Sequence, residues 1–103
     1  MTDQEQQYLE AGRAIGGATE SQMFGKPCFK TGGKAFISLF NDCMVFKLTG
    51  ATHTKALALN GAVPFDPSGK GRAMKEWVQV PFQHKALWPG LAEAAFAYVS
   101  SSL

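Results

Sequence analysis

The sequence predicts an α+β fold, a two-layer α/β sandwich in which helices cover one face of an antiparallel sheet. Three observations predict it. Apolar residues alternate with a period of two in the middle of the chain, and helical spacing occurs on either side. Short links of glycine, asparagine and aspartate separate the alternating runs, as in β-hairpins. The composition, 46% hydrophobic and 17% charged over 103 residues, suits one hydrophobic core.

We expect a single domain over residues 1–103 with the element order α-β-β-β-α-β-β-α. The first helix begins at Thr2, because Thr2 and Glu5 have the spacing of a capping box. It ends at Gly16-Gly17, since glycine tolerates the left-handed conformation found at helix C-termini. The apolar stripe of this helix is thin, which predicts that it docks at an edge of the sheet.

Three strands are predicted next, at residues 22–30, 34–40 and 43–48. Gly32-Gly33 separates the first pair and Asn41-Asp42 the second, and both dipeptides suit two-residue hairpin turns. The three strands should therefore form an antiparallel meander.

The second half of the chain is predicted to add a helix at residues 51–60 and strands at 63–66 and 76–80. A flexible basic loop, residues 67–72, joins these two strands. Pro89 suits the first turn of a terminal helix, because proline lacks only an N–H that has no helical partner there.

The tight turns fix a register, and the register assigns side chains to faces. With Thr31 opposite Lys34, Cys28 should lie opposite Ile37. The predicted core face carries Cys28, Ile37, Leu39, Met44, Phe46 and Leu48. The other face carries Phe29, Phe36, Phe40, Cys43, Val45 and Lys47.

The second face is too apolar for open solvent. Either a helix of this chain covers it, or it binds a protein partner or a second copy of the chain in a homodimer. The candidate interface consists of Phe29, Phe36, Phe40, Val45 and Lys47.

A set of short motifs in fixed order resembles a known family. The motifs are Met23-Phe24-Gly25, Gly33-Lys34-x-Phe36, Lys47, Pro64-Phe65-Asp66 and Met74-Lys75-x-Trp77-Val78-x-Val80-Pro81. Over residues 22–100 the chain resembles the N-terminal domain of the TfoX/Sxy competence regulators. The YjbR-like proteins, which are linked to DNA binding, are a second and weaker resemblance.

The resemblance implies a two-layer α/β fold and a non-enzymatic protein that regulates DNA-uptake genes. The competence regulators continue into a second, helical domain, and we expect this chain to be a stand-alone version. The motif residues with an expected structural role are Met23, Phe24, Gly25, Gly33, Phe36, Phe65, Met74 and Trp77.

Catalytic and metal sites are not indicated. Cys28 and Cys43 are not in CxxC spacing, and with His53 and His84 they show no zinc-ligand pattern. Asp66, between Phe65 and Pro67, is expected to fix a turn rather than to act as a base. We therefore predict no enzymatic activity, no metal and no cofactor.

Basic residues suggest two alternative functions. The glycines and cations of the loop could bind an anion or small molecule, or the loop could be a solvated hairpin connection. The same cations with Lys47 could contact nucleic acid beside the aromatic residues, although the net charge is only +2. The candidate residues are Lys47, Gly69, Lys70, Gly71, Arg72 and Lys75.

The expected location is the cytoplasm, without a membrane partner. The N-terminus lacks the order of a secretion signal, and no apolar run approaches the ~20 residues of a membrane span. The leading functional hypothesis is a non-catalytic regulatory module that binds another protein or itself. Nucleic-acid binding and anion or small-molecule binding are the alternatives.

Overall fold

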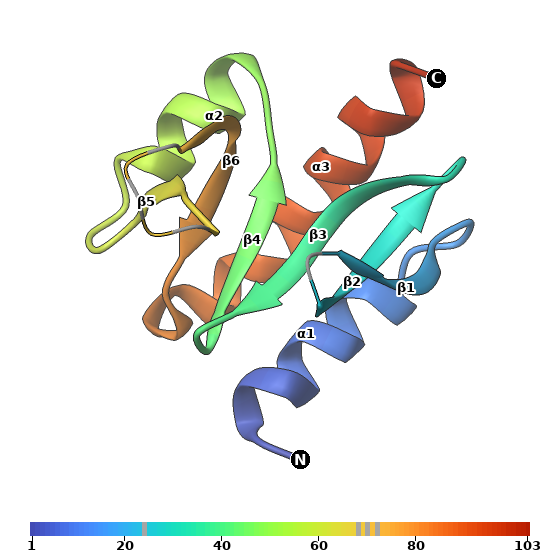
Figure 1. Cartoon of the computed structure of the whole chain (residues 1–103), viewed down its shortest axis with the longest axis horizontal. Coiled ribbons are helices and arrows are strands. Elements are labelled where there is room, and N and C mark those ends of the chain that lie inside the picture. Colours follow the sequence, from blue (N-terminus) through green and yellow to red (C-terminus); the bar gives the residue numbers. More distant parts are fainter. Residues whose placement is uncertain (24, 68, 70, 72) are drawn as a thin grey trace.

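The computed structural model describes residues 1–23, 25–67, 69, 71 and 73–103 (Figure 1). The strands pair into one antiparallel sheet with the order β1-β2-β3-β4-β6-β5. The elements are α1 (Asp3–Arg13), β1 (Thr19–Met23), β2 (Lys26–Thr31), β3 (Lys34–Phe40), β4 (Cys43–Lys47), α2 (Gly50–Leu57), β5 (Val63–Phe65), β6 (Met74–Val80), the 3-10 segment η1 (Phe82–Leu87) and α3 (Trp88–Ser101).

The helices lie on one face of the sheet, which confirms the predicted α+β, two-layer architecture. Figure 1 shows α1 and α3 behind the sheet, where α3 crosses β3 and β4. The helix α2 packs on β6 and also contacts α3. Pro89 lies in the first turn of α3, as the sequence predicts.

The first helix begins as predicted and ends earlier. The Glu5 amide donates to Thr2 Oγ1 at 3.1 Å, and Glu5 Oε1 accepts from the Thr2 amide at 3.2 Å, so the capping box is present. The helix ends at Arg13 rather than at Gly16-Gly17. Gly12 lies against the ring of Phe29, where a Cβ would clash, so α1 approaches the sheet closely.

The predicted strand at residues 22–30 is wrong, because a turn divides it. The structure has two antiparallel strands there, β1 and β2, with Met23 opposite Lys26. Gly25 adopts a positive φ of 74°, a conformation that glycine reaches without strain. The apolar residues before this glycine make the run look continuous in the sequence, and the described sheet has one strand more than predicted.

The predicted register holds at both hairpin turns and along β3 and β4, where Ile37 pairs with Phe46, and it fails only between β2 and β3 beyond their turn. Thr31 pairs with Lys34, but Cys28 pairs with Ser38 instead of Ile37. The register shifts between Phe29 and Lys30, which leaves an extra residue in β3. Such a β-bulge turns the side chains that follow it to the opposite face of the partner strand.

The bulge redistributes the aromatic residues. Phe29 now pairs with Ile37, and both lie in the main core between the sheet and the helices. Phe36 is the extra residue of the bulge and joins the same core, where its ring meets Phe96 of α3 edge-to-face at 5.3 Å. Cys28 was predicted on the core face, but its pairing with Ser38 places it on the other side.

A smaller apolar cluster lies on the sheet face away from the helices. Val45, Phe65 and Trp77 are buried there, with Phe40 packed against them. The rings of Phe40 and Phe65 lie 5.1 Å apart although their strands are three places apart, about 14 Å in a flat sheet. The sheet therefore curls around this cluster, and its own edges cover it.

Of the two alternatives for this face, cover by the chain itself or an interface with a partner, the structure shows the first for three of the five candidate residues. Phe29, Phe36 and Val45 are at most 1% exposed within the chain itself. The bulge moves the two phenylalanines under the helices, and the curled sheet covers Val45. Phe40 and Lys47 remain half-buried.

Candidate functional site

An apolar hollow lies between α2 and the start of α3. Its volume is about 300 Å³. One side of it is formed by α2 and by Leu59 just after this helix, and the other side by Leu87 at the end of η1 and by the first turn of α3. The lining residues are Thr52, Lys55, Ala56, Leu59, Leu87, Gly90 and Leu91.

Small residues make the hollow. Ala56 is the buried residue of α2, and its methyl group fills little of the space towards α3. Gly90 has no side chain, and a Cβ added there would meet nothing within 4 Å. Leucines form the walls, and Leu87 at the rim is 48% exposed. The hollow is therefore an apolar groove that is open to solvent along one side.

The polar groups of the hollow both come from α2. Thr52 carries a hydroxyl and Lys55 an ammonium group, and they lie three residues apart on one helix face. Lys55 is exposed and forms no ion pair with any described residue. None of the described residues that line the hollow carries a carboxylate. The lining is therefore almost wholly apolar, and the exposed Lys55 adds a positive charge at its rim.

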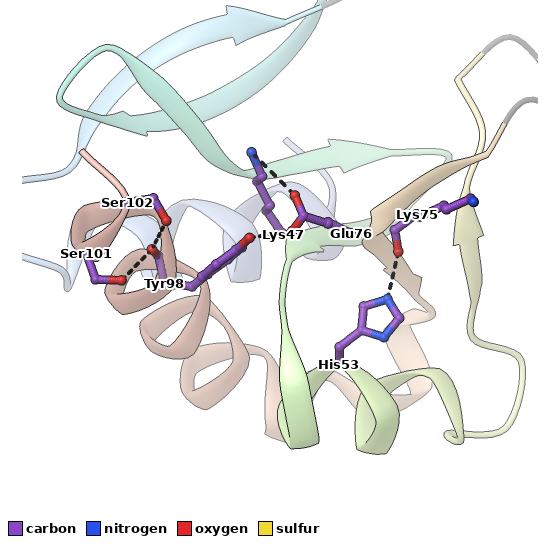
Figure 2. Close-up of polar contacts among 7 residues, drawn as sticks. All are labelled: Lys47, His53, Lys75, Glu76, Tyr98, Ser101 and Ser102. Atoms are coloured by element: carbon purple, nitrogen blue, oxygen red, sulfur yellow. Dashed lines mark hydrogen bonds and ion pairs between the residues drawn. The ribbon is translucent and has the colours of Figure 1, made fainter.

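A polar cluster lies elsewhere, where α3 passes β4 and β6 (Figure 2). The Tyr98 hydroxyl donates a hydrogen bond to Glu76 Oε2, and Lys47 Nζ lies 3.9 Å from Glu76 Oε1. The hydrogen bond to Glu76 is the main reason that the pKa of Tyr98 is raised. Glu76 thus ties Lys47 and Tyr98 together at the protein surface.

The predicted basic surface does not come together around Lys47. Figure 2 shows the side chains of Lys47 and Lys75 pointing away from each other, and Glu76 lies beside Lys47. Lys75 contributes its main chain instead, since its carbonyl accepts from His53 Nε2 at 2.7 Å and so links α2 to β6. A nucleic-acid surface built on these two lysines therefore receives little support.

The glycine-rich loop is organised by Asp66. Its carboxylate accepts from the Gly69 amide at 3.1 Å and from the Gly71 amide at 2.8 Å, which confirms the predicted turn-fixing role. These amides would be the donors for a bound anion, and they already have an acceptor. Lys70 and Arg72, the other predicted anion-binding residues, lie outside the described residues.

The cysteines and histidines are engaged in the fold. Burial is the largest cause of the raised pKa of the Cys28 and Cys43 thiols, which disfavours the nucleophilic thiolate. His84 Nε2 lies 2.8 Å from the Asn60 carbonyl oxygen, and His53 contacts a carbonyl in the same way. Because a carbonyl only accepts, both imidazoles carry a proton on Nε2. Among the described residues, no group of three or more potential ligands could hold a metal ion.

The motif residues that carry the family resemblance have structural positions. Phe65 and Trp77 pack in the smaller cluster with Met23 and Met74 beside them, and Phe36 packs in the main core. Gly25 and Gly33 have positive φ angles in turns. Phe24 lies outside the described residues.

Comparison of the chain with protein-family models, with curated proteins and with solved structures finds no match. The resemblance to the competence regulators therefore remains a prediction. No helix in the described part of the chain is long and apolar enough to cross a membrane.

None of the predicted site residues lines the hollow. The signal was present as the spacing of residues 52, 55, 56 and 59 and of 87, 90 and 91. Residues at such helical spacing ordinarily pack in the core, and the sequence does not show that these two sets face each other with a gap between them.

Proposed function

We propose that the protein is a non-catalytic binding module that takes a small, largely apolar ligand in the hollow between α2 and α3. One observation carries the proposal, namely the open apolar space of about 300 Å³ between α2 and the start of α3. Small-molecule sites begin at about this volume and are mostly apolar, with a few polar groups that orient the ligand.

Two further observations support binding rather than catalysis. Both imidazoles are occupied by main-chain carbonyls, and the raised pKa values of the thiols disfavour thiolate formation. The resemblance to the competence regulators supports a regulatory use of such binding.

The test is a titration of isotope-labelled protein with neutral apolar probes of about ten non-hydrogen atoms, such as 1-octanol and naphthalene, followed by NMR. We expect the amide shifts to concentrate in α2 and the first turns of α3. In the Gly90→Leu variant the new side chain fills the hollow, and these shifts should disappear. Shifts scattered over the surface, or unchanged in the variant, would count against the proposal.

A protein contact at the same place is the second candidate, because Leu87 is a large apolar residue that is 48% exposed at the rim. This candidate keeps the predicted role of an interaction module, but its binding surface lies on the helices and not on the sheet. Light scattering over a dilution series tests self-association there. A dimer that Leu87→Asp converts into a folded monomer would establish this candidate, and a monomer at all concentrations would exclude a second copy.

A further inference from the structure

We propose that the ligand of the hollow is a small apolar molecule that ends in a carboxylate, which Lys55 binds. This inference rests on the proposed function, because it names the ligand class of the same site. Three observations support it: the charge of the lining, the size of the hollow and the surroundings of Gly90.

The charge of the lining selects the ligand's polar end. Lys55 supplies a positive charge without an ion pair among the described residues, and Thr52 adds a hydroxyl one helical turn away. Because the described lining holds no carboxylate, a ligand ammonium group would meet only like charge. A carboxylate would gain a charge-assisted hydrogen bond, which is stronger than one between neutral groups.

The size of the hollow selects a small ligand over a protein. A stable protein–protein interface uses about 20–30 residues on each side, far more than the lining of the hollow supplies. A volume of about 300 Å³ is at the lower end for small-molecule sites. The occupant is therefore small, and a carboxylic acid with a chain of about ten carbons is a suitable probe.

Gly90 is an exposed residue in the first turn of α3, and its missing side chain leaves the hollow wider at this point. Glycine inside a helix is less favourable than alanine, and Gly12 in α1 is explained by its contact with Phe29. Gly90 has no such neighbour, since a Cβ at this position would meet no other atom within 4 Å. An alanine there should raise the stability of α3 and narrow the hollow. The substitution should therefore favour folding and weaken ligand binding.

The test compares three chains of equal length, decanoate, 1-decanol and decylamine, each below its micelle concentration. Dissociation constants come from NMR titration of the wild-type protein. We expect decanoate to bind up to about fivefold more tightly than 1-decanol, with decylamine weakest, because an exposed ion pair contributes at most about 1 kcal/mol.

Charge reversal supplies the decisive variant. In the Lys55→Glu variant the order of the three affinities should invert, so that decylamine binds most tightly. Lys34→Glu, at the distant turn between β2 and β3, makes the same charge change and should leave the order unchanged. Thermal unfolding of both variants checks that each is folded.

The outcomes separate this inference from the proposed function. If decanoate, 1-decanol and decylamine bind with equal affinity, and Lys55→Glu changes none of these affinities, the inferred carboxylate is wrong and the hollow is an apolar site only. No binding of any chain, or binding that persists in Gly90→Leu, would overturn both. A concentration-dependent dimer that excludes the probes would show that a second copy fills the hollow, and would overturn the inference as well.

Discussion

Three glycines on helices or near their ends have different neighbours. These neighbours determine how a substitution by alanine changes the stability of the fold. At Gly12 a Cβ would overlap the buried ring of Phe29, whereas at Gly16 and Gly90 it would meet nothing within 4 Å. Packing against the sheet therefore accounts for the first glycine alone.

The Gly12→Ala substitution should destabilise the fold by about 1–3 kcal/mol, because α1 must move away from the sheet to admit the methyl group. Alanine's higher helix propensity offsets only part of this loss. Gly16→Ala is the matched control and should change the free energy of unfolding by less than about 0.5 kcal/mol. Urea denaturation measures both, and equal values for the two variants would show that the contact with Phe29 is not tight.

Tyr8 makes the free energy of unfolding depend on pH in the alkaline range. Burial raises the pKa of its hydroxyl, mainly through the loss of hydration, and only 2% of the residue is exposed. The folded state holds this proton above pH 10, where the unfolded state loses it, so the stabilising contribution is present below about pH 10 and is lost as pH rises further.

The measurement is urea denaturation of wild type and Tyr8→Phe at pH 8 and pH 11. The wild-type free energy of unfolding should fall more between the two values than that of Tyr8→Phe, because phenylalanine has no proton to lose. An identical fall in both proteins would mean that Tyr8 ionises equally in the folded and unfolded states.

At the scale of the elements, the bulge at Phe29 and Lys30 determines which aromatic residues belong to the core. Phe36 is fully buried against Phe96 in the main core. The Phe36→Ala substitution should therefore cost about 3–5 kcal/mol and lower the stability of the monomer. Thermal unfolding with light scattering checks this, and a stable variant that merely loses a dimer would restore the predicted sheet interface.

Local chemistry explains which elements the sequence could predict. The capping box at Thr2 and the turns at Gly32-Gly33 and Asn41-Asp42 depend on neighbouring residues, and the structure contains all of them. The bulge depends on how two strands pair, and no local residue pattern marked it. The turn at Gly25 was missed because apolar residues precede a lone glycine.

The candidate site was less predictable than the fold. Its residues come from two segments of the chain more than 25 positions apart, and a hollow is a property of how those segments pack. The spacing of Lys55 and Ala56 with Leu59 could be seen in the sequence, but it did not show that Gly90 lies across from them. The cover of the candidate interface was unpredictable for the same reason, since the bulge that moves Phe29 and Phe36 under the helices and the curl that covers Val45 both depend on long-range contacts.

At the scale of the whole molecule, different elements cover the two faces of the sheet. The helices cover one face, and the curled sheet covers much of the other with its own strands. The seam between α2 and α3 is an open apolar hollow among the described residues, which is why we propose binding there.

Binding at the seam is best tested by the dissociation constant of decanoate for Gly90→Leu beside wild type, measured with the melting temperature of each protein. Leucine is a better helix former than glycine and fills open space at Gly90. We expect at least tenfold weaker binding by a variant that melts at the same or a higher temperature. Unchanged affinity in that stable variant would contradict binding at the seam, because the ligand would then bind outside the hollow.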